Sequence, residues 1–243
     1  ILMIGKSWDA VNDPMVGVLS DRTSSPWGRR LPWMLYGAVP FGLFFFLQWI
    51  VPPLTSWGLF WYYVIIAIFF NSFYTAVNLP YTALTPELTQ DYDERTSLNS
   101  FRFTFSIGGS ILSLFLALGV FSLLKIEQQQ QYLVLAGICT VLSVLPLFWC
   151  VWGVRDRVLA TEARRMETET EEQIPVFQQL RIAFSNRPFL FVAGIYLCSW
   201  LGVQVTASIL PYFVVNWMGL SEAEFNLVAI AVQGTALLML YVW

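Results

Sequence analysis

The chain has 243 residues, of which 57% are hydrophobic and 12% are charged. Soluble domains are about 25% charged, so this composition excludes an ordinary water-soluble globule. The sequence contains no histidine, which excludes imidazole-based catalysis and histidine metal sites. Its net charge is −3, and the basic residues follow the connections instead of gathering in one patch. We therefore expect neither an enzyme nor a nucleic-acid partner.

Long apolar stretches approach or reach the roughly 20 residues that a helix needs to cross a bilayer. Tryptophans gather near the ends of these stretches, where amphipathic rings favour the interface with water. The fold class predicted is therefore all-α, a polytopic bundle of transmembrane helices. The expected spans are 1–20, 33–51, 57–84, 99–124, 132–154, 188–217 and 223–243.

The orientation of the spans follows from the basic residues in alternate connections. Arginines occupy the first, third and fifth connections: Arg22, Arg29, Arg30, Arg95, Arg155, Arg157, Arg164, Arg165, Arg181 and Arg187. The other connections carry only Lys125. Because cytoplasmic loops are enriched in basic residues, we expect the arginine-rich connections to be cytoplasmic. The first span then runs inward, and a further helix precedes it if the N-terminus is cytoplasmic.

One long polar segment, residues 155–187, divides the chain into two predicted bundles. It separates an N-terminal bundle at 1–154 from the start of a C-terminal bundle at 188–243. Within it, an acidic run is followed by a short amphipathic stretch at 176–184. A solvated loop with an interfacial helix is favoured over a regulatory site.

The first span contains ionisable residues that are costly inside a membrane. Lys6, Asp9 and Asp13 stand at i, i+3 and i+7, which places them within about 60° on one helix face. Asn12 adds a neutral oxygen, and Pro14 removes an amide donor beside them. Ionisable residues within spans usually face a cavity, pair with each other or carry transport.

Two chemistries fit these oxygens. A hard cation prefers oxygen ligands, while two nearby carboxylates raise each other's pKa and can hold an exchangeable proton. The sequence leaves both Na⁺ and H⁺ open. The structural alternative is a salt bridge between Lys6 and Asp9 that only holds helices together, although it leaves Asp13 without a partner in this stretch.

Further polar residues occur in the third and fourth spans. Thr75, Asn78 and Thr82 repeat the i, i+3, i+7 spacing, with Tyr81 between them. Arg102 lies just inside the fourth span, where a guanidinium can clamp an anionic or hydroxyl-rich ligand.

The alternative role for Arg102 is a purely structural ion pair. Its possible partners are Glu87 and Asp91, both near the predicted cytoplasmic end of the third span. The sequence favours neither role over the other.

Two long motifs resemble a known family. The stretch GVLSDRTSSPWGRR at 17–30 resembles the cytoplasmic signature of the major facilitator superfamily. More specifically, WDAVNDPMVGVLSDRTSSPWGRRLPW and NLPYTALTPELTQDYDERTSLNSFRF are similar to the melibiose-permease-like glycoside-pentoside-hexuronide:cation symporters. The resemblance implies helices two to eight of an expected twelve, with helix one and helices nine to twelve outside this chain.

The resemblance implies roles for individual residues. A charge-relay latch corresponds to Asp21, Arg22, Arg29 and Arg30. The cation ligands correspond to Asp9, Asn12, Asp13 and Thr75. The substrate-binding positions correspond to Lys6, Asn78, Tyr81, Thr82 and Arg102. The sugar site departs from the family, because Asn78 replaces a carboxylate and Thr82 replaces a stacking Trp.

The leading hypothesis is a secondary active transporter that couples Na⁺ or H⁺ entry to uptake of a sugar or glycoside by alternating access. One alternative is a sodium-dependent lysophospholipid carrier of the same fold, and another is a non-transporting membrane scaffold or sensor. We expect a monomer in the cell membrane (the inner or plasma membrane). Its expected partners are a small solute and membrane lipid, with no cofactor or metal beyond the coupling cation.

Overall fold

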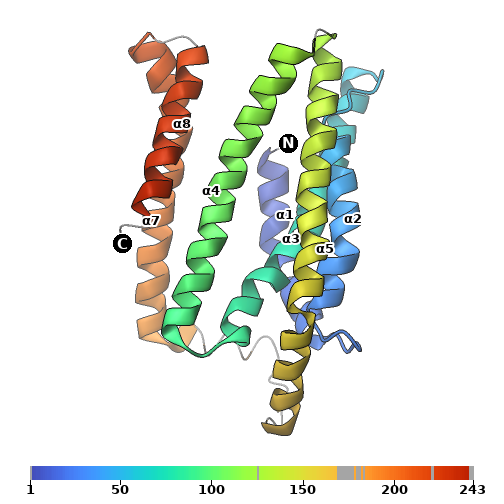
Figure 1. The fold of residues 1–243 in the computed structure, drawn as a ribbon, viewed down its shortest axis with the longest axis vertical. Helices are drawn as coiled ribbons and strands as arrows, with labels where there is room; N and C mark the ends of the chain where they lie inside the picture. The colour runs from blue at the N-terminus through green and yellow to red at the C-terminus, as the bar shows by residue number, and fades with distance from the viewer. Residues whose placement is uncertain are drawn as a thin grey trace. The chain divides into compact units, whose positions relative to one another are not determined.

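The computed structural model describes residues 2–124, 126–168, 178, 182, 184–219 and 222–240, with side chains described from Trp8 onward except in 164–168, 222–227 and 229. Every element within these residues is a helix, and the elements run in the order shown in Figure 1. They are α1 (Leu2–Arg22), α2 (Leu31–Leu47), α3 (Ser56–Leu88), α4 (Tyr92–Leu123), α5 (Gln128–Thr168), α7 (Arg187–Tyr212), the π-helix η1 (Phe213–Trp217) and α8 (Glu222–Met239).

The all-α prediction is confirmed; each predicted span coincides with one helix, except that span 188–217 covers both α7 and η1. The helix ends differ from the predicted span ends because hydropathy marks the apolar part of a helix and not its hydrogen-bonded length. The largest difference is in α5, which continues from the predicted end at 154 to Thr168. The rest of the acidic run after Thr168 and most of the amphipathic stretch at 176–184 lie outside the described residues.

Caps and prolines fix several helix starts. The Thr55 hydroxyl accepts the Gly58 N–H at 3.3 Å before α3, and the Asp91 carboxylate accepts the Glu94 N–H at 2.9 Å before α4. Pro32 lies in the first turn of α2, where its missing N–H costs nothing. These local signals allow long helices to follow one another through short connections.

Among the residues that the structure describes, four helices are long and apolar enough to cross a membrane: α3, α4, the 128–163 part of α5, and α7 continued by η1. The helix α2 is apolar but has only 17 residues. The helix α1 contains several charged residues, including Asp9 and Asp13. These charges lower the hydropathy of α1, and they are also the residues on which the predicted cation site rests.

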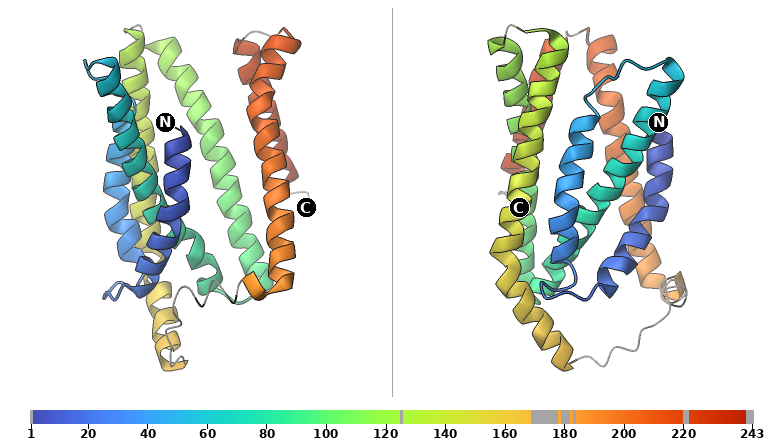
Figure 2. Two further views of the ribbon diagram at one scale, coloured as in Figure 1. Left: turned by 180° about the vertical axis from the view of Figure 1, so that it is seen from behind. Right: turned by 90° about the vertical axis from the view of Figure 1, so that its right-hand side faces the viewer.

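The chain divides into two compact units, residues 1–169 and 170–243. Within the first unit, α2 packs on both α3 and α5, while α1 packs on α3 (Figures 1 and 2). The helix α4 borders α5 and α3. The second unit contains α7, η1 and α8. The domain boundaries expected at 154 and 188 stay predictions.

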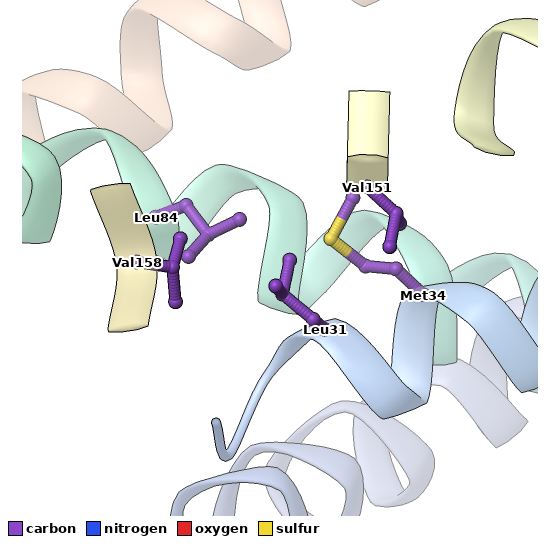
Figure 3. Packing of buried hydrophobic residues seen from close by; sticks show 5 residues of the cluster. All are labelled: Leu31, Met34, Leu84, Val151 and Val158. Atoms are coloured by element: carbon purple, nitrogen blue, oxygen red, sulfur yellow. The ribbon is translucent and has the colours of Figure 1, made fainter. Parts of the chain in front are cut away.

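An apolar cluster joins α2, α3 and α5 near the end of the bundle where the α1–α2 connection lies (Figure 3). Its buried members are Leu31, Met34, Leu84, Val151 and Val158. Leu31, Met34 and Val151 have no exposed surface. This cluster holds the helix ends that carry the charged residues of the connection.

Candidate functional site

The site begins on α1, whose polar residues lie against α3. Asn12 is buried, with 7% of its surface exposed, while Asp9 is half-buried and Asp13 is exposed. Thr75 on α3 is also 7% exposed, and its hydroxyl donates a hydrogen bond to Asp13 Oδ1 at 2.8 Å. The structure therefore brings together two of the predicted cation ligands from two different helices.

Asn12 adds an unusual polar atom to this interface. Its buried Nδ2 has no hydrogen-bond partner among the described residues. Leaving a buried donor unsatisfied costs about 1–3 kcal/mol, so a functional reason for Asn12 at this position is expected. The two ends of an Asn amide are assigned from their partners, and the reversed orientation presents an oxygen instead. Asn12 can therefore supply an oxygen to a bound cation.

A second polar contact joins the same two helices. The Trp8 indole Nε1 donates to the Ser72 hydroxyl at 2.8 Å, and that hydroxyl donates to the Ile68 carbonyl. Ser72 and Thr75 are one helical turn apart, so α3 holds α1 at two neighbouring points. These contacts fix the position of Asp13 along the helix axis relative to Thr75. Lys6 belongs to α1, but its side chain lies outside the described residues.

The predicted substrate positions are distributed over several faces. Asn78 and Thr82 are half-buried on α3, and the Thr82 hydroxyl donates to the Leu79 carbonyl at 2.9 Å. Tyr81 instead packs against the apolar cluster of α2, α3 and α5. Helical spacing predicted that these residues are neighbours along α3, and the packing separates Tyr81 from the others.

Arg102 lies half-buried on α4. Its guanidinium carbon is 5.6 Å from the centroid of the Phe103 ring. Its two predicted structural partners have other contacts: Glu87 binds arginines of the α1–α2 connection, and Asp91 caps α4. Neither predicted ion pair of Arg102 is therefore formed among the described residues, and its ligand-binding role stays a prediction.

The residues of the predicted latch gather at the opposite end of α1. Arg30 Nη2 lies 3.1 Å from Asp21 Oδ1 and 2.8 Å from Glu87 Oε1. Arg29 Nη2 bonds the same Glu87 oxygen. Arg22 is exposed in the last turn of α1, where its positive charge interacts favourably with the negative end of the helix dipole. Arg22 of the predicted latch forms no ion pair with the others among the described residues, so from here on the latch means Asp21, Arg29, Arg30 and Glu87.

Sequence reasoning missed three of these participants as site residues. Glu87 was considered only as a partner of Arg102, while Trp8 and Ser72 were not assigned a contact. Glu87 had a usable signal, because it is an acidic residue that ends a long apolar helix opposite a basic connection. The Trp8–Ser72 contact had none, because their separation of 64 residues leaves no periodic pattern.

Carboxylates, an amide and a hydroxyl between helices of an apolar bundle are typical of one class of protein, the polytopic membrane transporters. Comparison with known proteins agrees. The chain matches the family described as MFS/sugar transport protein over residues 1–243, and it belongs to that family. It is an integral membrane protein of the major facilitator superfamily.

Three relatives illustrate the range of this family. The chain is 46% identical to an uncharacterized symporter of Synechocystis sp., covering 100% of this chain and 59% of the relative. It is 28% identical to the isoprimeverose transporter of Lactiplantibacillus pentosus, with coverage of 88% and 44%. It is 24% identical to the sodium-dependent lysophosphatidylcholine symporter 1 of Homo sapiens, with coverage of 100% and 48%. The chain thus spans about half the length of these relatives.

Proposed function

We propose that this protein is a symporter that uses a cation bound between α1 and α3 to drive uptake of a sugar or glycoside. The observation that carries the proposal is the contact between Asp13 and Thr75, beside buried Asn12 and half-buried Asp9. All four side chains offer oxygen atoms, which suit a hard cation. A carboxylate inside a membrane helix is expensive, and a bound cation offsets that cost.

Coupling follows if the cation favours the arrangement that binds solute. Cation and solute share α3, because Thr75 belongs to the cation site and Asn78 lies one turn further along. A cation that holds α1 against α3 therefore fixes the position of the first solute-binding side chain. Linkage requires that the bound cation raise solute affinity and that the solute raise cation affinity by the same factor.

The solute class is argued from Asn78, Thr82 and Arg102, whose amide, hydroxyl and guanidinium groups suit the hydroxyl groups of a sugar. The isoprimeverose transporter is one relative whose name agrees with this class. A lysophospholipid is the second candidate. It is favoured by the Thr82 hydroxyl donating to its own helix, which reduces the polarity that α3 presents.

Counterflow in proteoliposomes containing the full protein tests both candidates. Labelled glycosides and lysophosphatidylcholine are each measured with a Na⁺ gradient, with a pH gradient and with neither. We expect glycoside accumulation that depends on one of the two gradients. Accumulation of lysophosphatidylcholine alone supports the second candidate, and an absence of exchange for every solute contradicts the symporter proposal.

A pair of variants ties the activity to the site. Asp13→Asn removes the charge and should abolish gradient-driven accumulation. Asp93→Asn removes a charge from the exposed first turn of α4 and should leave accumulation unchanged. If Asp13→Asn accumulates solute like the unmodified protein, the cation-binding role of Asp13 is contradicted.

A further inference from the structure

The end of α5 extends past α1, α2 and α3 and lies against the α1–α2 connection (Figures 1 and 2). Two contacts that involve no acidic residue attach α5 there. The Arg155 guanidinium carbon lies 4.6 Å from the centroid of the Trp27 ring. Val158 is 7% exposed and belongs to the apolar cluster with Leu31 (Figure 3). The extension is therefore a packed part of the bundle.

Glu162 lies one turn beyond Val158 and makes a third contact. Its Oε1 accepts the backbone N–H of Arg29 at 3.1 Å and lies 3.9 Å from Arg29 Nε. Only 17% of the Glu162 side chain is exposed. A carboxylate that accepts a backbone N–H makes a charge-assisted bond, which is about twice as strong as a neutral one.

The backbone of the connection is shaped to fit this carboxylate. Gly28 has φ +82°, a conformation that other residues rarely adopt. A Cβ atom on Gly28 would lie 2.3 Å from Glu162 Oε2. Glycine at this position therefore serves two needs at once, because it permits the turn and lets the carboxylate approach the next N–H.

The charges of the latch explain why an additional carboxylate, that of Glu162, is stabilising beside it. The guanidinium groups of Arg29 and Arg30 converge on one oxygen of Glu87, and two like charges so close repel each other. Asp21 binds Arg30, whereas the additional carboxylate beside Arg29 is Glu162. Each arginine thus has one carboxylate of its own in addition to the shared Glu87.

We propose that Glu162 is a positioning residue of the transport cycle, which docks the α5 extension on the α1–α2 connection and holds Arg29 and Arg30 on Glu87. The role in transport rests on the symporter function proposed above. The helices α1 and α3 carry the proposed cation site as well as Asp21 and Glu87 of the latch. Asp21 lies only about 12 Å along α1 from Asp13 at 1.5 Å per residue.

Backbone hydrogen exchange of the full protein tests the docking without any transport assay. Glu162→Ala should raise exchange at least tenfold in residues 23–30 and several-fold at the end of α3, which carries Glu87. Glu162→Gln keeps an oxygen for the Arg29 N–H and should recover most of the protection at 23–30. The end of α3 is the informative readout, because a purely local contact leaves it unchanged.

The control uses an ion pair on the same extension. Arg157 Nη1 lies 4.0 Å from Glu94 Oε1, and both side chains are more than half exposed, at 78% and 53%. Such exposed pairs contribute little, so Arg157→Gln should exchange like the unmodified protein. Unchanged exchange in Glu162→Ala, or equal effects of both variants, overturns the proposal.

Transport kinetics then test the role in the cycle. Glu162→Ala should lower maximal turnover per folded protein several-fold, while the half-saturation concentrations for cation and solute stay within twofold. An unaltered turnover together with raised exchange shows that the residue is only structural and overturns its role as a positioning residue. An absence of transport in the unmodified protein contradicts the symporter function instead, and the exchange result still decides whether Glu162 docks the extension.

Discussion

The Thr75 hydroxyl donates to Asp13 and can still offer its lone pairs to a cation, because a hydroxyl oxygen is an acceptor as well as a donor. This dual capacity distinguishes Thr75 from an apolar residue of the same shape. Burial strengthens the effect, since Thr75 is only 7% exposed and few waters can replace a missing oxygen. A side chain of the same shape without this oxygen atom could pack at position 75 but could not bind a cation there.

Thr75→Val tests this oxygen with little change in volume. Hydrogen bonds to charged groups contribute about 1.5–3 kcal/mol, so the half-saturation concentration for the coupling cation should rise about tenfold or more. The measurement is the cation dependence of glycoside uptake in proteoliposomes. Thr75→Ser keeps the oxygen and should stay within about threefold of the unmodified protein. Equal affinities in the Val and Ser variants contradict a ligand role for Thr75.

At the scale of elements, α2 packs closely on two neighbours, α3 and α5. Gly37 faces α3, where an added Cβ would lie 2.9 Å from Val77 Cγ2. Gly42 faces α5, where an added Cβ would lie 2.5 Å from Val144 Cγ2 and 3.2 Å from Thr140 Cγ2. Small residues that let helices approach closely are the usual basis of packing in lipid.

Gly42→Ala should therefore destabilise the bundle by about 1–3 kcal/mol, the usual cost of overpacking. Val144→Ala removes the obstructing methyl groups, so the double variant should be more stable than the sum of the single effects predicts. The midpoint of thermal unfolding in detergent measures all three variants. Gly153→Ala on α5 is the control, because an added Cβ there meets no atom within 4 Å. Additive effects of Gly42→Ala and Val144→Ala contradict the proposed contact.

The helices themselves could be predicted from hydropathy, because a bilayer imposes a minimum apolar length on each span. The shared face of Asp9 and Asp13 followed from helical periodicity alone. The extension of α5 was missed because residues beyond Val154 are polar and resemble a loop in composition. A signal was present: Val151, Val154, Val158 and Glu162 follow helical spacing along one stripe. The partner of that stripe could not be predicted, since Arg29 is 133 residues away.

At the scale of the whole molecule, the distribution of charge assigns the two ends of the first bundle to opposite sides of the membrane. The latch and the arginines of the α1–α2 connection lie at one end. The α2–α3 connection at the other end contains no Lys or Arg between Leu47 and Ser56. Translocation of basic residues across the membrane is disfavoured, so the latch belongs on the cytoplasmic side.

Cysteine labelling of the full protein in sealed vesicles tests this orientation. In a background without the native cysteines, Ser24→Cys reports the latch end and Ser56→Cys the other end, because both positions are exposed. A membrane-impermeant maleimide should modify Ser24→Cys in inside-out vesicles and Ser56→Cys in right-side-out vesicles. Detergent should make both sites reactive in either preparation, which controls for local shielding. The reverse pattern places the latch outside and contradicts its assignment as a cytoplasmic element, whereas the cation site between α1 and α3 does not depend on the orientation.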